Sequence, residues 1–109
     1  MGITKTEDFT LRQNKIARYM KVFGHPARVA ILELLAKKQS CICGDIVEDL
    51  PLSQSTVSQH LKELKDSGLI KGDIEGAKVC YCIDENEWEN TKKYLFNFFE
   101  SVSVKNKCC

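Results

Sequence analysis

A three-residue connection, Pro51-Leu52-Ser53, separates two short segments whose apolar residues recur at helical spacing. The first segment, at about residues 42–50, must end before the proline, because a residue that precedes proline is pushed out of helical geometry. The second starts after Ser53, a good helix N-cap, and Gly68 is a natural C-terminal stop. So short a turn restricts how two helices can be arranged, and it predicts a helix-turn-helix over about residues 42–67.

The apolar pattern changes period directly after this unit. Leu69-Ile70 opens a strand, residues 75–77 suit a turn, and apolar side chains take alternate positions from Val79 to Ile83. This pattern predicts a β-hairpin, or wing, over about residues 69–83. The predicted fold class is therefore mainly α with a small β-hairpin (α+β), a winged helix-turn-helix that forms a single domain over residues 1–109.

Three further amphipathic helices are predicted, over about residues 7–23, 26–38 and 85–104. The helix over residues 26–38 is expected to turn Val29 and Leu32 inward. The first and last of the five predicted helices would leave apolar and aromatic surface exposed in a monomer. Helices 1 and 5 are therefore predicted to form the dimer interface of a homodimer.

The second helix of the helix-turn-helix presents polar side chains outward. Short hydroxyls, amides and a cation are the groups that base edges and phosphates accept in a major groove, although a merely solvated face would look similar. We predict DNA contacts from seven residues of this helix: Gln54, Ser55, Thr56, Ser58, Gln59, His60 and Lys62. The net charge is only +1, but the first forty residues hold eight Lys and Arg against three Asp and Glu, so one side can still be basic.

Six cysteines form three close pairs: Cys41 and Cys43, Cys80 and Cys82, and Cys108 and Cys109. The N-terminal residues lack the apolar core of a signal peptide, and no segment approaches the roughly 18 apolar residues of a membrane span. We therefore expect a cytoplasmic protein with no membrane partner. In that compartment close-set cysteines more often serve metal binding or redox chemistry than structural disulfides.

Several stretches of the chain look like the signature stretches of one family: Gly24-His25-Pro26-Ala27-Arg28, Leu52 to Lys62, Leu64, Gly68-Leu69-Ile70 and Val79-Cys80-Tyr81. They resemble the ArsR/SmtB family of winged-helix, metal-sensing repressors over about residues 12–100, and the string that begins at Leu52 is the most specific part. The resemblance implies a homodimer that binds an inverted repeat of operator DNA. It also implies release of that DNA when a metal or metalloid binds.

The same resemblance implies a location for the metal site. Cys41 and Cys43 stand where arsenic-, antimony- and cadmium-sensing members carry a Cys-x-Cys motif. This place is the start of the first helix of the helix-turn-helix, directly before the second helix, which is the recognition helix. Ile46 occupies the place of a third cysteine, so that ligand must come from elsewhere, and the tail pair Cys108 and Cys109 is one candidate. The implied inducer is As(III) or Sb(III), with Cd(II) or Pb(II) next, and no cofactor is obligatory.

The predicted helix would also give Cys41 and Cys43 a physical role. A helix N-terminus should lower the pKa of their thiols, which makes better ligands for soft metals. Helical residues two apart point about 200° away from each other, so one ion could bind both thiolates only by unwinding the first turn. We predict that this unwinding is the switch. Cys80 and Cys82 share one face of a strand, about 6.5 Å apart, as further ligands or as a tolerated exposed pair.

Two alternatives to a metal-released repressor stay open. A repressor of the same fold could sense oxidants or reactive sulfur by forming a disulfide or polysulfide between cysteines. An enzyme finds little support, because the sequence has no Cys-x-x-Cys motif, no nucleotide-binding loop and no neighbouring base for a thiol nucleophile. Residues 84–109 contain no histidine, which argues against a zinc or cobalt site between the last helices.

Overall fold

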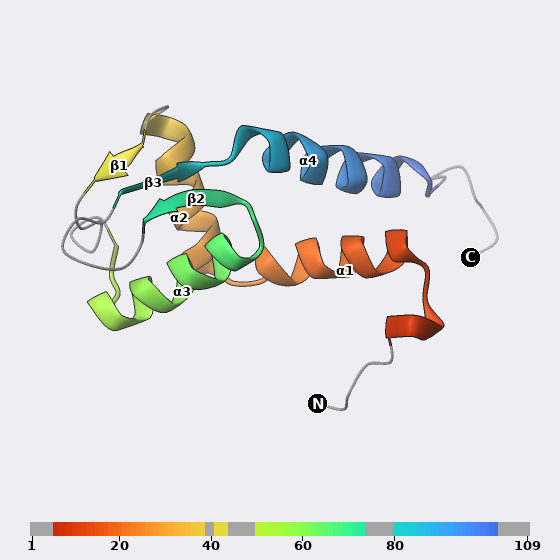
Figure 1. The fold of residues 1–109 in the computed structure, drawn as a ribbon, viewed down its shortest axis with the longest axis horizontal. Coiled ribbons are helices and arrows are strands. Elements are labelled where there is room, and N and C mark those ends of the chain that lie inside the picture. The colour runs from red at the N-terminus through yellow and green to blue at the C-terminus, as the bar shows by residue number, and fades with distance from the viewer. Residues whose placement is uncertain (1–5, 39–40, 44–49, 74–79, 103–109) are drawn as a thin grey trace.

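The computed structural model describes residues 6–38, 41–43, 50–73 and 80–102. Within these ranges the chain forms a 3₁₀ turn, four α-helices and three short strands. In chain order they are η1 (Thr6–Asp8), α1 (Leu11–Val22), α2 (Pro26–Lys38), β1 (Ile42–Cys43), α3 (Gln54–Asp66), β2 (Ile70–Asp73), β3 (Cys80–Ile83) and α4 (Glu85–Glu100). Helices α1 and α4 lie side by side and extend away from the end that holds the sheet, α2 and α3 (Figure 1).

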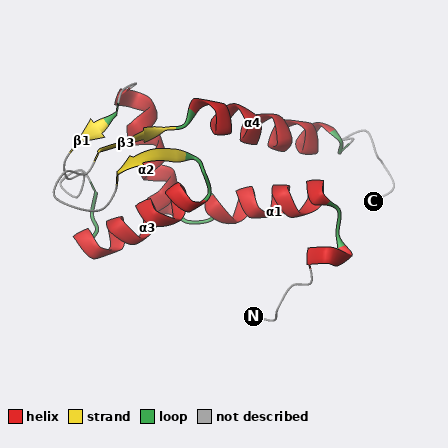
Figure 2. Ribbon diagram, in the orientation of Figure 1, coloured by secondary structure: helices red, strands yellow, loops and turns green. Residues whose placement is uncertain are grey.

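The architecture confirms the predicted fold class. Helix α3 is followed by the antiparallel strands β2 and β3, which are the predicted wing, and helices dominate the rest of the described chain (Figure 2). The last predicted helix corresponds to α4, so α1 and α4 are the two elements predicted to form the dimer interface. None of the helices in the described ranges is long and apolar enough to cross a membrane.

Helix α1 begins at Leu11 and not near residue 7 as predicted. Thr10 is its N-cap: the Thr10 hydroxyl accepts from the Gln13 backbone N–H at 3.1 Å, and the Gln13 side chain accepts from the Thr10 N–H at 3.0 Å. This reciprocal capping box satisfies two backbone donors that would otherwise face only water. The apolar pattern starts earlier because Phe9 continues it, but Phe9 lies before the helix and is 55% exposed.

The prediction of a helix that starts at residue 42 is wrong at its first two residues. Ile42 and Cys43 form strand β1, which pairs antiparallel with β3, so the sheet has the order β1-β3-β2. Ile42 is β-branched and packs against the core from its place opposite Tyr81, and both properties favour a strand. Residues 44–49 of the predicted helix and the turn at 75–77 lie outside the described residues.

The pairing of β2 with β3 depends on a glycine within β2. Gly72 has φ +121°, and a Cβ at that position would collide with the backbone of Cys80 and Tyr81 in the facing strand. Only glycine adopts this conformation without strain, and only glycine allows the strands to approach this closely.

The core lies between α2, α3 and the sheet, and its largest fully buried side chains outside α1 are Ile31, Leu64, Leu69, Ile70 and Tyr81. Leu32 is buried as predicted, whereas Val29 is 39% exposed and the inward prediction for it is wrong. Helices α1 and α4 are joined by a hydrogen bond, in which the buried Tyr19 hydroxyl donates to the Glu87 carboxylate at 2.7 Å. Burial raises the pKa of Tyr19, and the hydrogen bond to the Glu87 carboxylate raises it further.

Candidate DNA-binding surface and cysteine site

Helix α3 separates its residues into a buried face and an exposed polar face. Its N-terminus is fixed by Ser53, whose hydroxyl accepts from the Thr56 backbone N–H at 3.3 Å and lies 2.9 Å from the Thr56 hydroxyl. Of the seven predicted DNA contacts, five are exposed: Gln54, Ser55, Ser58, Gln59 and Lys62. Thr56 is half-buried and bonded to its cap, and His60 is 7% exposed on the core side.

His60 belongs instead to a polar network that fixes α3 against α2. Arg28 in α2 donates two hydrogen bonds to side chains of α3. Its Nε donates to Nδ1 of His60 at 3.1 Å, and its Nη2 donates to the Glu63 carboxylate. It also donates through Nη1 to the Val22 carbonyl at the end of α1, at 3.4 Å. One guanidinium therefore joins three helices and sets the position of the recognition helix.

This environment favours the neutral form of His60. Burial is the largest cause of its lowered pKa, followed by the nearby His25, whose ring centroid lies 4.3 Å away, and by the charge of Arg28. The Glu63 carboxylate acts in the opposite direction. A neutral His60 keeps Nδ1 free to accept the hydrogen bond from Arg28, so the low pKa and the geometry agree.

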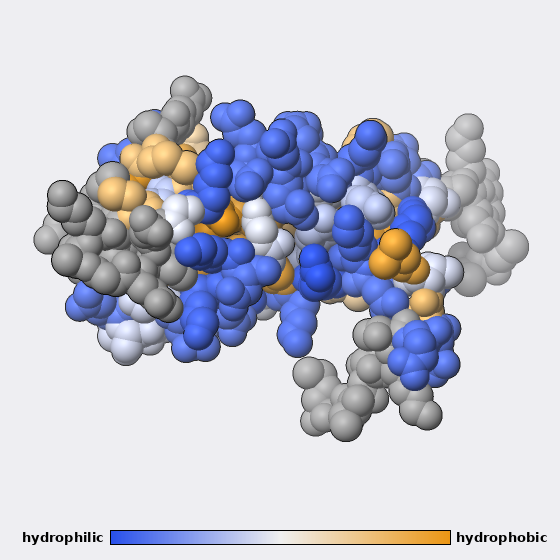
Figure 3. Space-filling model, in the orientation of Figure 1, coloured by the Kyte–Doolittle hydropathy of each residue, from blue (hydrophilic) through white to orange (hydrophobic). Residues whose placement is uncertain are grey.

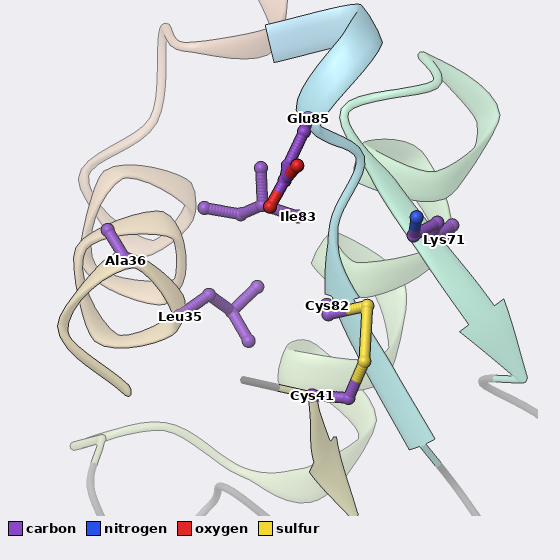
Figure 4. Close-up of a pocket in the computed structure, with 7 residues that line it drawn as sticks. All are labelled: Leu35, Ala36, Cys41, Lys71, Cys82, Ile83 and Glu85. Carbon is purple, nitrogen blue, oxygen red and sulfur yellow. A yellow bond between two sulfur atoms is a disulfide. The ribbon is translucent and has the colours of Figure 1, made fainter. Parts of the chain in front are cut away.

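The structure brings together two cysteine pairs that are separated by nearly forty residues. Strand β1 runs antiparallel to β3 in a register that makes Cys43 the Cα partner of Cys80. Two residues further along the ladder, Cys41 and Cys82 are joined by a disulfide, with their Cα atoms 4.3 Å apart (Figure 4). Cys108 and Cys109, the predicted tail donors, lie outside the described residues.

This arrangement corrects two predictions about Cys41 and Cys43. Cys43 lies in strand β1 and Cys41 directly precedes that strand, so neither residue belongs to the first turn of a helix. Residues two apart on an extended strand lie on the same face. No helical turn has to unwind for them to act together, and the predicted unwinding switch loses its premise.

A pocket of about 640 Å³ opens beside the disulfide. Leu35 and Ala36 of α2 line one side, and Lys71 of β2 lines another; Cys82 itself forms part of the wall (Figure 4). The Cα partner of Cys82 across the β2–β3 ladder is Lys71, so a cation and a sulfur share one position of the sheet. The cysteine site is therefore open to small solutes.

The helices α1 and α4 carry exposed apolar side chains at the end away from the sheet. Part of this surface, which we call the apolar patch, is visible near the start of α1 (Figure 3). Its members are large and at least one third exposed: Phe9, Leu11, Phe96, Phe98, Phe99 and Val102. Monomeric proteins rarely expose so many large apolar groups together.

A signal for the pairing of Cys41 with Cys82 was present in the sequence. Both cysteine pairs have the spacing of two that places side chains on one face of a strand, and residues 80–83 were predicted to form a strand. The sequence around Cys41-Ile42-Cys43 also fits a helix, because Ile42, Ile46 and Leu50 recur every four residues.

Comparison with known proteins agrees with this architecture. A family model described as bacterial regulatory protein, arsR family, matches residues 25–71, which span α2, β1 and α3. In fold, the chain matches the crystal structure of Rv0081 of Mycobacterium tuberculosis with a TM-score of 0.60 and 25% identity, over 85% of this chain and 97% of that one.

Two relatives extend the match in sequence. The uncharacterised HTH-type transcriptional regulator MJ1325 of Methanocaldococcus jannaschii is 39% identical over 83 residues, which is 74% of this chain and 92% of that protein. The arsenical resistance operon repressor of Staphylococcus xylosus is 36% identical over 67 residues, which is 62% of this chain and 64% of that protein. Both relatives are described as regulators of transcription or of an operon, and neither is described as an enzyme. This chain belongs to the arsR family of bacterial helix-turn-helix regulatory proteins.

Proposed function

We propose that this chain is a transcriptional repressor that binds operator DNA as a homodimer and leaves it when a thiophilic metal or metalloid binds its cysteine thiolates. Arsenite or antimonite is the favoured inducer, and cadmium or lead comes next. One observation carries the proposal: Cys41 and Cys82 meet on the sheet that contacts the recognition helix α3 through β2. The protein acts in the cytoplasm, where thiols are kept reduced.

The DNA-binding half of the proposal is supported by the exposed polar face of α3. Gln54, Ser58 and Gln59 project amide and hydroxyl groups from the first two turns, and Lys62 adds a cation. In a symmetric dimer the two copies of α3 enter successive major grooves about 34–36 Å apart, which requires an inverted repeat in the operator. Binding should weaken as salt rises, because lysines and arginines neutralise phosphates.

The homodimer is supported by the apolar patch on α1 and α4. A second copy that covered Phe99, which is 61% exposed, and its neighbours would remove this surface from water. We expect sedimentation equilibrium to give a dimer for the full chain and a monomer for Phe99→Asp. The control Asn97→Asp adds the same charge at another exposed position of α4. A dimer that persists in Phe99→Asp would contradict this interface.

Arsenite binding to thiols is a ligand exchange that needs no oxidant. Three thiols and one As(OH)₃ form three As–S bonds, and each thiol proton leaves with one hydroxide as water. The oxidation state of arsenic does not change. A coupling free energy of about 1–3 kcal/mol between ion binding and DNA binding corresponds to an operator affinity about 5- to 150-fold weaker when the ion is bound.

The disulfide between Cys41 and Cys82 favours a second candidate function. A repressor that senses peroxides would form this bond directly: two thiols and one hydroperoxide give a disulfide, an alcohol and water. Lasting disulfides are rare in the cytoplasm, so a cytoplasmic bond of this kind is expected to be transient and regulatory. Metal sensing and oxidant sensing use the same thiols, and they compete.

A DNA-release titration distinguishes these candidates. The reduced protein is bound to an inverted-repeat site selected from a random DNA pool, and fluorescence anisotropy follows release by arsenite, cadmium, zinc or hydrogen peroxide. We expect arsenite to release the DNA from the wild type and not from Cys41→Ser, Cys43→Ser, which should still bind DNA. Release by peroxide alone would favour the oxidant sensor. Arsenite release from the double variant would refute a role for these thiols.

A further inference from the structure

We infer that Cys80 and Cys82, in the wing strand β3, are thiolate ligands that complete the ion site begun by Cys41 and Cys43. The inference deepens the proposed function and rests on it for its regulatory meaning. The family resemblance left the third ligand unassigned, because Ile46 stands in its usual place. The sheet supplies two ligands from a different part of the chain.

The strand register carries the inference. Cys43 and Cys80 are Cα partners, and Cys41 is disulfide-bonded to Cys82 two residues further along the ladder, so the four cysteines occupy two rungs with one rung between them. That middle rung is Ile42 with Tyr81. Tyr81 is fully buried and Ile42 packs against the core. Because positions alternate between the two faces of a sheet, the cysteine positions share the face opposite Tyr81.

The spacing of these positions suits one ion. The Cα atoms of Cys41 and Cys82 are 4.3 Å apart, close to the roughly 4.5 Å of a narrow pair in an antiparallel ladder, where facing side chains come closest. Pairs alternate between narrow and wide, so Cys43 and Cys80 occupy a narrow position as well. A tetrahedral ion with metal–sulfur bonds of about 2.3 Å holds its sulfurs roughly 3.8 Å apart, within reach of a narrow pair.

The surroundings admit an ion and favour charged sulfur. Cys41 is exposed and Cys82 is half-buried at the wall of the 640 Å³ pocket, so a hydrated ion can reach both. Lys71 is the Cα partner of Cys82 in the neighbouring strand β2, and its ammonium offsets part of the negative charge of several nearby thiolates. These features come from three strands and α2, and none depends on the C-terminal tail.

The site binds an ion only in its reduced form. Cys41, Cys80 and Cys82 are all in disulfide form here, and in this state no three His, Cys, Asp or Glu residues of the described ranges are placed to hold a metal. Once reduced, four thiols bind one Cd²⁺ as a tetrathiolate with loss of up to four protons and no change of oxidation state. All-thiolate coordination selects soft ions such as Cd(II). Any three of the four would satisfy As(III).

Cadmium titration of the reduced protein, without DNA, tests this ligand set. Ultraviolet thiolate-to-cadmium charge-transfer absorbance rises with the number of thiolates bound. The variants are Cys80→Ser, Cys82→Ser; Cys41→Ser, Cys43→Ser; and the matched tail control Cys108→Ser, Cys109→Ser. Circular dichroism and DNA binding in the ion-free state confirm that each variant is folded.

We expect each of the two sheet variants to lose about half of the saturating absorbance and to bind cadmium at least tenfold more weakly, while the tail control matches the wild type. Full absorbance in Cys80→Ser, Cys82→Ser, or a loss in the tail control, would overturn the assignment. Fluorescence anisotropy of bound operator DNA, measured during the same cadmium titration, separates this result from the proposed function. The expected absorbance pattern without release of DNA would support the four ligands and refute release by cadmium.

Discussion

Arg28→Met should loosen the recognition helix, because it removes the one side chain that joins α2 to both His60 and Glu63 while it keeps the apolar stem. His60 is 7% exposed, and leaving its Nδ1 without a donor costs about 1–3 kcal/mol. The Glu63 side chain is 43% exposed, so water replaces its partner and the loss there is under about 1 kcal/mol. The 3.4 Å bond to the Val22 carbonyl adds little. We expect a total of about 2–3 kcal/mol.

Urea unfolding followed by the fluorescence of Trp88, the only tryptophan of the chain, measures this change. The comparison needs one fixed protomer concentration, because association stabilises the folded state. For a chain of this size the loss corresponds to roughly 10 °C in Tm. Arg12→Met, at an exposed arginine of α1, is the control and should stay within about 0.5 kcal/mol. A change equally small in Arg28→Met would refute the account of the three-helix network.

Three further outcomes follow from the same structure. Gly72→Ala should destabilise the wing by about 2 kcal/mol or more, because φ is +121° and the added Cβ meets the backbone of Cys80; an unchanged Tm would contradict this. The lowered pKa of His60 means that its neutral form stabilises the fold above about pH 6.5 and that this contribution is lost as the pH falls through the folded-state pKa. Tm should therefore fall between about pH 7 and 5, and less so in His60→Gln; equal slopes would argue against it. Replacing the exposed Ser58 and Gln59 by Ala should weaken specific DNA binding tenfold or more and leave Tm within about 2 °C; unchanged affinity would show that another face contacts DNA.

Local patterns in the sequence predicted much of the fold. The start of α3 at Gln54 follows from Ser53 as its cap, and the strand at Cys80–Ile83 follows from the period of two. These features depend on neighbours within a few residues, which a single sequence displays. The start of α1 was missed because Phe9 extends the apolar pattern beyond the Thr10 cap. His60 was predicted as a DNA contact, but it is buried, because its position on α3 does not reveal the partner Arg28.

The cysteine site was only half predictable. Two residues of it could be located from the sequence, but its partner strand could not, because pairing of β1 with β3 joins segments far apart in the chain. Ile42 fits a helix by its spacing to Leu50 and a strand by its β-branched side chain. Tertiary pairing with Tyr81 decides between these options, and propensity alone does not.

The short connection between β3 and α4 links the cysteine site to the orientation of α4. Only Ile83 separates Cys82 from Asp84, which caps α4 and is tied to Leu69 by a backbone hydrogen bond. The 16 residues of α4 form a rod of about 24 Å that carries Phe99 near its tip. A tilt of about 5° at its base would displace that tip by roughly 2 Å. In a dimer joined at the tips, a small change at the sulfurs would thus alter the distance between the two DNA-reading helices.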